Sequence, residues 1–225
     1  MVLGGDGTIL RGAELTRERN IPLLGINIGH VGFMAEVIRP EISAVAKSVI
    51  DKSYGLDSRM VLAYEVIRSG KVIDTGWALN EVTVERQHTT MVELFVQIDG
   101  RPLSRWGCDG LIASTPTGST AYSLSAGGPI LHPRVFGIVL APVAPHALSN
   151  RPIVLPGDAL IGITIISGKD ASVHFDMQSM AILQTGDMVV VNKSSKTITI
   201  LHPQGHSDYR TLREKLHWNE YPSSF

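Results

Sequence analysis

The sequence has a single cysteine, no excess of charge of either sign and no long apolar run. Because Cys108 is alone, an intramolecular disulfide and a cysteine-cluster metal site are both excluded, which fits a reducing cytoplasm. Lys and Arg number 20 against 21 acidic residues, so neither a nucleic acid nor an anionic membrane is expected as a partner. The longest apolar runs, such as 160–166, are far shorter than the roughly 20 residues that span a bilayer. Any anionic ligand must therefore be held by a local site.

The residues that are present predict a globular protein whose first fifty-odd residues alternate between strand and helix. Of 225 residues, 44% are hydrophobic and 18% are charged, which allows one large core or two modest ones. Residues 1–3 look like the end of a buried strand, which implies further sequence ahead of them. Residues 8–18 carry a helical stripe that includes Ile9, Ala13 and Leu15.

The next segments repeat the alternation. Residues 22–27 predict a buried strand, and a glycine-punctuated loop covers 28–32. Pro40 sits where a helix would begin that continues through Val49. This order of elements is the α/β pattern expected of a parallel sheet.

After Ser58 the pattern changes to short strands separated by Gly, Pro and Asp turns. A helix is expected at 119–126 and another at 208–217. Strands are expected at 60–68, 72–84, 91–98, 137–143, 160–166, 172–175, 188–191 and 197–201, with Asp99-Gly100 as a hairpin turn. The sequence therefore predicts an α/β region followed by a β-rich region.

The run Gly4-Gly5-Asp6-Gly7-Thr8 lies between the first strand end and the first helix. Free N–H groups and the helix dipole favour a phosphate there, and glycines let the main chain approach it closely. A carboxylate beside a phosphate suits a magnesium ligand or a base for an attacking hydroxyl. A tight turn with Asp6 as an N-cap is the alternative. The run matches neither the P-loop nor the dinucleotide fingerprint.

Three later segments place polar residues beside apolar strands. Asn80-Glu81 falls inside the expected strand 76–84, so that one of the two is buried or at a site unless the strand is a solvated edge. Cys108-Asp109-Gly110 precedes an apolar run. The segment 114–122 then carries five hydroxyl side chains and ends in Tyr122. Hydroxyls and helix N–H groups suit a ribose and a purine, so this segment predicts a nucleoside site, with a capped helix start as the alternative.

His202 and His206 have the spacing of zinc-binding helices. Pro203 and Gly205 lie between them and make a helix improbable, so a surface loop is the favoured interpretation. No metal ligand is predicted.

The Gly-Gly-Asp-Gly-Thr turn resembles the one shared by NAD kinases, diacylglycerol and sphingosine kinases and, with serine, 6-phosphofructokinases. The order GGDGT, NE, CDG, TPTGSTAY and SAGGPI is similar to that of bacterial NAD kinases over nearly the whole chain. Lipid kinases of the diacylglycerol type place Asn-Glu almost directly after GGDGT, whereas Asn80-Glu81 comes much later here. The spacing argues against them.

The resemblance implies a truncated α/β domain over 1–57, a β-rich NAD-binding domain over 58–202 and a C-terminal segment, 203–225, that packs back on the α/β domain. It implies Asp6 as the general base. It also implies a set of nucleotide-binding residues: Gly7 and Arg11 near the bound nucleotide, Phe33 beside the nicotinamide, Asn80 and Glu81 on NAD, Asp109 on the ribose, Thr117, Thr120, Ala121 and Tyr122 around the adenine, and Ser125 and Gln178. Met177 departs from the glycine or serine usual before that glutamine.

The resemblance further implies the substrates and partners. ATP, carried with Mg²⁺ or another divalent metal, would phosphorylate the adenosine ribose 2′-hydroxyl of NAD to give NADP, and inorganic polyphosphate stays open as a donor. A cytoplasmic homodimer or homotetramer is implied. The alternatives are a lipid kinase and a regulatory module that binds nucleotide without phosphoryl transfer.

Overall fold

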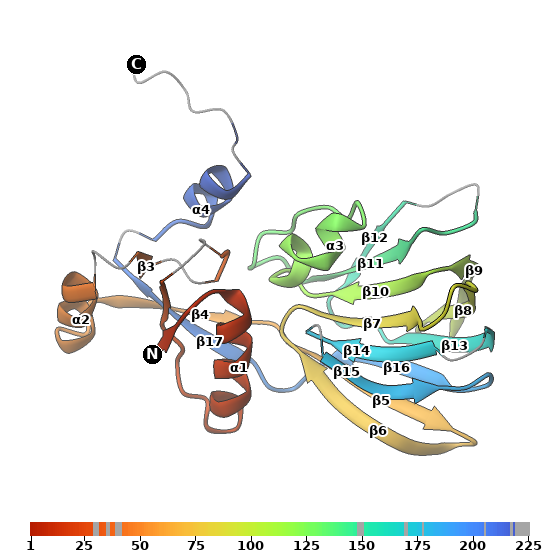
Figure 1. Cartoon of the computed structure of the whole chain (residues 1–225). Coiled ribbons are helices and arrows are strands. Elements are labelled where there is room, and N and C mark those ends of the chain that lie inside the picture. Colours follow the sequence, from red (N-terminus) through yellow and green to blue (C-terminus); the bar gives the residue numbers. More distant parts are fainter. Residues whose placement is uncertain are drawn as a thin grey trace. The chain divides into compact units, whose positions relative to one another are not determined.

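The computed structural model of the chain describes residues 1–28, 32–34, 37–38, 42–147, 151–168, 171–176, 178–204, 206–216 and 218. The chain forms two compact units, the first from Met1–Arg59 and Thr197–Phe225 and the second from Met60–Lys196 (Figure 1). The division falls at Arg59 and Thr197, against 57 and 203 in the sequence expectation. Within the described ranges, no helix is long and apolar enough to cross a membrane.

The first unit contains a small parallel sheet, a second pair of strands and the longer helices. The parallel sheet has the order β1-β2-β3, with bounds Val2–Leu3, Gly25–Asn27 and Val37–Ile38. Its helices are α1 (Asp6–Thr16), the short 3-10 helix η1 (Arg17–Arg19), α2 (Ile42–Ile50) and α4 (Asp208–Lys215). Antiparallel strands β4 (Tyr54–Arg59) and β17 (Ile198–Pro203) form the pair.

Helix α1 packs on the parallel sheet through Ile9, Gly12 and Ala13, which are all buried. A Cβ on Gly12 would lie 2.6 Å from a methyl carbon of Val2, so glycine allows the helix to approach β1 closely. Leu15, which the sequence placed in the buried stripe, is 81% exposed. The prediction that Leu15 is buried was therefore wrong. The buried face of α1 includes Gly12, which an apolar pattern does not mark because glycine has no side chain.

A charged cluster connects β4, β17 and the start of α4. Arg59 is nearly buried, and its guanidinium lies 2.8 Å from Asp57 and 3.6 Å from Asp208. The rings of His202 and His206 stack with centroids 3.8 Å apart. His202 is buried near the end of β17. The surface loop that the sequence predicted is therefore wrong for this residue. A hydrogen bond from His202 is the main reason that the pKa of Asp57 is lowered.

The second unit consists of two six-stranded antiparallel sheets. One has the order β12-β11-β10-β7-β14-β15, with bounds Ile153–Pro156, Gly137–Val143, Gly110–Ser114, Glu81–Arg86, Ala171–Phe175 and Gln178–Leu183. The other has the order β6-β5-β16-β13-β8-β9, with bounds Lys71–Ala78, Leu62–Arg68, Met188–Lys193, Ile161–Ser167, Val92–Ile98 and Arg101–Cys108. Alternate residues of both sheets, among them Leu94, Leu111 and Ile163, form one buried core.

Strand β10 is buried on both faces because α3 (Tyr122–Ser125) covers the side away from this core. Ile112 packs there with Val139 and Ala141, against the partly buried Tyr122 and Ala126 (Figure 1). The sequence predicted one helix over 119–126. Two short helices form instead, η3 (Gly118–Thr120) and α3, because Ala121 between them leaves the helical conformation.

Most expected strands are present with shifts of one or two residues, but the expected strand 72–84 is two strands. Strand β6 ends at Ala78 and β7 begins at Glu81, in the other sheet. Leu79 and Asn80 form the connection, so Asn80 does not lie in a strand. Strands β3, β4, β9, β12 and β15 had no sequence prediction. Gly29–Val31, Pro40, Met177, Gly205 and His217, on which sequence predictions fell, lie outside the described residues.

The shared core predicts a large stability difference between two leucines of one hairpin. Leu94 in β8 is fully buried, whereas Leu103 in β9 is 42% exposed. Leu94→Ala should lower the free energy of unfolding by about 2–5 kcal/mol, because it leaves a cavity. Leu103→Ala should change it by about 0.5 kcal/mol or less. Urea unfolding of both variants measures the difference, and equal losses would contradict a core between the sheets.

Candidate functional site

In the first unit, the glycine turn connects β1 to α1 as the sequence predicts. Gly4 donates its N–H to Ile26 O at 2.9 Å and has φ +150°. A Cβ there would lie 2.3 Å from the Thr8 hydroxyl, so the turn itself requires glycine. Gly7, by contrast, is exposed, and a Cβ on it would meet none of the described residues within 4 Å. Packing against the described part of the chain therefore does not explain the glycine at position 7.

The Asp6 carboxylate holds the segment 32–34. Its Oδ2 accepts the N–H of Phe33 at 2.8 Å, and its Oδ1 accepts the N–H of Met34 at 2.9 Å. A Cβ on Gly32 would lie 1.9 Å from Oδ1, so only glycine fits against the carboxylate. The N-cap of α1 is Gly5, and Asp6 is the first helical residue. The N-cap interpretation of Asp6 is therefore wrong.

Phe33 and Arg11 are two further residues of this unit that the sequence predicted to contact the nucleotide. Phe33 is half-buried and directly bonded to Asp6 through its main chain. Arg11 is exposed on α1, four residues after Gly7, and so lies on the same side of the helix as Gly7.

In the second unit, a pocket of about 610 Å³ contains two of the predicted residues, Asp109 and Tyr122. Its other lining residues are Glu85, Arg86, Gln87, His88, Thr89 and Val143. Burial and the carboxylates of Glu85, Asp109 and Glu81 raise the pKa of Tyr122. The pocket thus combines a phenol with two carboxylates, those of Glu85 and Asp109, and such hydrogen-bonding groups suit a ribose.

Arg86 holds the Asp109 carboxylate in a two-point ion pair. Its Nε lies 2.6 Å from Oδ1, and its Nη2 donates to Oδ2 at 3.0 Å. Arg86 also donates through Nη1 to His88 O at 2.6 Å. Arg86 was not predicted from the sequence. The register of β7 against β10, which places Glu85 opposite Gly110, brings it beside Asp109, and no local pattern reports that register.

The hydroxyl-rich segment is mostly turned inward. The hydroxyls of Ser114, Thr115 and Ser119 are buried and donate to main-chain carbonyls. These three side chains stabilise the turn and do not face a ligand, so the nucleoside argument was wrong for them. Thr117 and Thr120 stay as candidates, the latter donating to Thr117 O at 3.3 Å.

The remaining members of the predicted set lie around this turn and on β15. Ala121 is partly buried, Ser125 is exposed at the end of α3, and Gln178 begins β15 opposite Phe175. None of these three lines the pocket beside Asp109.

Glu81 is 1% exposed, and its Oε2 has no hydrogen-bond partner among the described residues. Burial, followed by the charges of Asp176 and Glu85, raises its pKa to about 8, although the N–H of Tyr122 bonds to the carboxylate. A buried carboxyl group near neutral pKa can donate a hydrogen bond as well as accept one. Such groups are typical of binding and catalytic sites.

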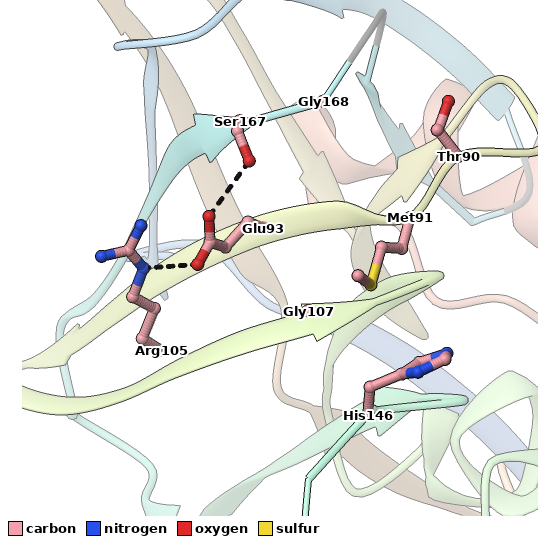
Figure 2. A pocket seen from close by; sticks show the side chains of 8 residues that line it. All are labelled: Thr90, Met91, Glu93, Arg105, Gly107, His146, Ser167 and Gly168. Atoms are coloured by element: carbon pink, nitrogen blue, oxygen red, sulfur yellow. Dashed lines mark hydrogen bonds and ion pairs between the residues drawn. The ribbon is translucent and has the colours of Figure 1, made fainter.

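A second pocket of the same unit, of about 950 Å³, contains none of the predicted residues. It is lined by Thr90, Met91, Glu93, Arg105, Gly107, His146, Ser167 and Gly168. Figure 2 shows the Glu93 carboxylate between Arg105, at 2.6 Å, and the Ser167 hydroxyl, at 3.0 Å. The hydrogen bond from Arg105 lowers the pKa of Glu93. The charged side chains of this pocket therefore largely satisfy one another.

A glycine turn before a helix, together with a nucleoside-type pocket on an antiparallel β unit, defines a nucleotide-dependent phosphotransferase. The sequence matches the ATP-NAD kinase N-terminal domain over residues 1–54 and the ATP-NAD kinase C-terminal domain over residues 79–202. The chain belongs to the NAD kinase family.

Similar proteins cover nearly the whole chain. It is 50% identical over 224 residues to an NAD kinase of Cupriavidus pinatubonensis (strain JMP 134 / LMG 1197), covering 99% of this chain and 73% of that one. It is 49% identical over 225 residues to an NAD kinase of Burkholderia pseudomallei (strain K96243), covering 100% and 75%.

Two solved structures share the fold. Yeast NADH kinase complexed with NADH has a TM-score of 0.90 and 32% identity, covering 99% of this chain and 67% of that one. An NAD kinase from Archaeoglobus fulgidus in complex with ATP has a TM-score of 0.79 and 26% identity, covering 97% and 82%.

The raised pKa of Glu81 predicts a pH-dependent stability. Unfolding returns the carboxyl group to an ordinary pKa near 4.5, so the unfolded state loses its proton at lower pH than the folded state. Stability should fall as the pH rises from about 4.5 through about 8. Glutamine does not titrate, so Glu81→Gln should not lose stability in this way. The free energy of unfolding of Glu81→Gln minus that of the unsubstituted chain should therefore rise over this pH range, by on the order of a few kcal/mol.

Thermal melting of both proteins between pH 5 and 8.5 measures this effect. Glu65→Gln, which removes a carboxylate from the exposed side of β5, is the control for a general change in charge. A pH-independent difference between Glu81→Gln and the unsubstituted chain would contradict the assignment.

Proposed function

We propose that the chain transfers the γ-phosphoryl group of ATP to the 2′-hydroxyl of the adenosine ribose of NAD, with Asp6 as the general base. Phosphorylation of NAD by ATP is the activity of the family to which the chain belongs. The observation that carries the finer proposal is the Asp6 carboxylate, held in one orientation at the start of α1 by the N–H groups of Phe33 and Met34.

The held carboxylate supports the role of a base. A carboxylate can accept the proton of a hydroxyl, and the two N–H bonds keep the Asp6 carboxylate in a fixed orientation for this role. In the proposed step the 2′-oxygen attacks the γ-phosphorus, its proton passes to Asp6, and the bond to the β-phosphate oxygen breaks to release ADP. Main-chain N–H groups of the glycine turn would stabilise the charge on the transferred group.

Mg²⁺ fits this proposal as part of the ATP substrate. In the described part of the chain, no group of three or more His, Cys, Asp or Glu residues could hold a metal ion. A divalent metal delivered with ATP neutralises the phosphates and needs few protein ligands.

The second unit would supply NAD binding. Asn80, Glu81, Asp109 and Tyr122 would contact the adenosine half, and Arg86 would keep the Asp109 carboxylate oriented toward a ribose. Thr117, Thr120, Ala121, Ser125 and Gln178 would complete the nucleotide site, and Gly7, Arg11 and Phe33 of the first unit would contact the nucleotide near Asp6. These roles rest on the family resemblance, and the contacts above are compatible with them.

Two proposals concern the protein's setting. The resemblance supports a homodimer or homotetramer. A cytoplasmic location is supported by the resemblance and by the single, buried Cys108, which is a free thiol. The lipid-kinase and non-catalytic alternatives are not favoured, because relatives at about half identity are NAD kinases.

An end-point assay tests the proposed function. The protein is incubated with ATP, Mg²⁺ and NAD, and the product is read with an NADP-specific dehydrogenase. NADP formation supports the proposal, and phosphate on any other hydroxyl overturns the assignment of the acceptor. Replacing ATP with inorganic polyphosphate in the same assay tests the donor.

Asp6→Asn should lower kcat by about 10²–10⁴, because an amide cannot accept the proton. Binding of NAD, measured by calorimetry, should change much less than kcat. Glu14→Gln, a similar change at an exposed position of α1, is the control and should keep normal turnover. A near-normal rate in Asp6→Asn would remove Asp6 from the mechanism.

Gly7→Ala should separate stability from activity. The added methyl group meets no atom of the described residues within 4 Å, and alanine favours a helix, so the free energy of unfolding should rise by about 0.4–1 kcal/mol. The same methyl group should hinder a phosphate at the turn and lower kcat/KM for ATP by about tenfold or more. Gly55→Ala in β4, where a Cβ also has room, is the control. Unchanged kinetics in Gly7→Ala would argue against a ligand at this turn.

A further inference from the structure

Asp176 binds the main chain of the connection between β6 and β7. Its Oδ1 accepts the N–H of Asn80 at 2.7 Å and that of Glu81 at 3.3 Å, and its Oδ2 accepts the N–H of Leu79 at 2.9 Å. In return, the N–H of Asp176 donates to Glu81 O at 3.1 Å. Asp176 thus fixes the main chain of three consecutive residues that are distant from it in the sequence.

The position of Asp176 in the fold explains how it reaches them. It follows β14, whose last residue Phe175 pairs with Val82 of β7, so the next residue lies beside the start of β7. Asp176 has φ +44°, an unusual left-handed conformation for a residue other than glycine. Such a conformation in a buried turn indicates that the side chain is required there.

The carbonyl side of the same connection is also fixed. The Thr115 hydroxyl donates to Leu79 O at 2.6 Å, and the Thr115 N–H donates to Asn80 O at 2.8 Å. Gly118 packs so closely that a Cβ on it would lie 2.1 Å from Asn80 O. With both its N–H and its carbonyl groups held, the main chain at Asn80 and Glu81 has one available conformation.

We propose that Asp176 is a positioning residue, whose carboxylate fixes the main chain at Leu79, Asn80 and Glu81 so that the side chains of Asn80 and Glu81 are held ready for the nucleotide. The proposal rests on the proposed function, since it takes Asn80 and Glu81 as NAD-binding residues. Asp176 itself acts through these two residues and is not a catalytic residue.

A structural role alone would give a different result from a positioning role. Asp187 is the matched comparison within the same unit: it is also buried, its carboxylate also accepts a main-chain N–H, that of Gln184 at 2.7 Å, and it also belongs to a turn. Its side chain pairs with Arg68, and none of its hydrogen bonds within the described residues reaches the 79–81 connection. Asp187→Asn should therefore lower stability without changing NAD binding.

Two variants of Asp176 separate the carboxylate from the turn. Asp176→Asn keeps the size of the side chain but replaces one acceptor with an NH₂ group that faces an N–H donor. Asp176→Gly suits the left-handed conformation and removes the carboxylate entirely. Circular dichroism and melting first establish that each variant is folded.

The experiment compares these variants in steady-state kinetics and in amide hydrogen exchange. Both Asp176 variants should raise KM for NAD by about tenfold or more with kcat changed by less than about threefold, while Asp187→Asn keeps KM within about twofold. Exchange should accelerate at the amides of 79–81 in the Asp176 variants and stay slow there in Asp187→Asn. A normal KM in Asp176→Gly, unchanged exchange at 79–81, or an equal rise of KM in Asp187→Asn would overturn the proposal.

The positioning role of Asp176 and the proposed function can fail independently in this experiment. Should the unsubstituted protein form no NADP, the proposed function fails, and the dissociation constant for NAD from calorimetry takes the place of KM. A loss of NAD affinity confined to the Asp176 variants would still support positioning. Equal affinity in all variants would overturn it.

Discussion

Three main-chain N–H groups at the junction of β6 and β7 converge on the Asp176 carboxylate. Removing a carboxylate from water is expensive unless its oxygens are bonded, and hydrogen bonds to a charged acceptor contribute about 1.5–3 kcal/mol each. These bonds allow the chain to leave one sheet at Ala78 and enter the other at Glu81 without unpaired main-chain groups. The same bonds fix the main chain that carries the polar pair Asn80 and Glu81, whose side chains are both largely buried.

The first unit uses the same physical arrangement at the glycine turn. There the Asp6 carboxylate accepts the N–H groups of Phe33 and Met34, and Gly32 allows the main chain to lie against it. In each unit a carboxylate fixes a segment that is distant in sequence. The two carboxylates differ in exposure: Asp176 is 7% exposed, whereas Asp6 is half-buried.

Local patterns in the sequence predicted the elements whose information is local. A continuous apolar run predicted β11 at its observed bounds, and Asp99-Gly100 predicted the hairpin between β8 and β9. The break at Leu79-Asn80 was missed because its cause, the Asp176 carboxylate, lies 96 or 97 residues away. Likewise, the pairing of Arg86 with Asp109 depends on strand register, which composition does not report. The order of motifs, from the glycine turn to Gln178, therefore identified more of the candidate site than periodicity did.

The glycines distinguish what the fold requires from what a ligand requires. At Gly4, Gly32 and Gly118 a Cβ would lie within 2.3 Å of a side-chain or main-chain oxygen, so packing alone accounts for them. At Gly5 and Gly7 a Cβ would meet none of the described residues within 4 Å. Gly7 lies inside α1, where a glycine destabilises the helix by about 0.5–1 kcal/mol relative to alanine. Among the described residues, no contact accounts for a glycine at position 7. Because Gly7 lies at the start of α1, where unpaired helix N–H groups favour negative charge, the close approach of an anionic group is the explanation that the proposed function offers.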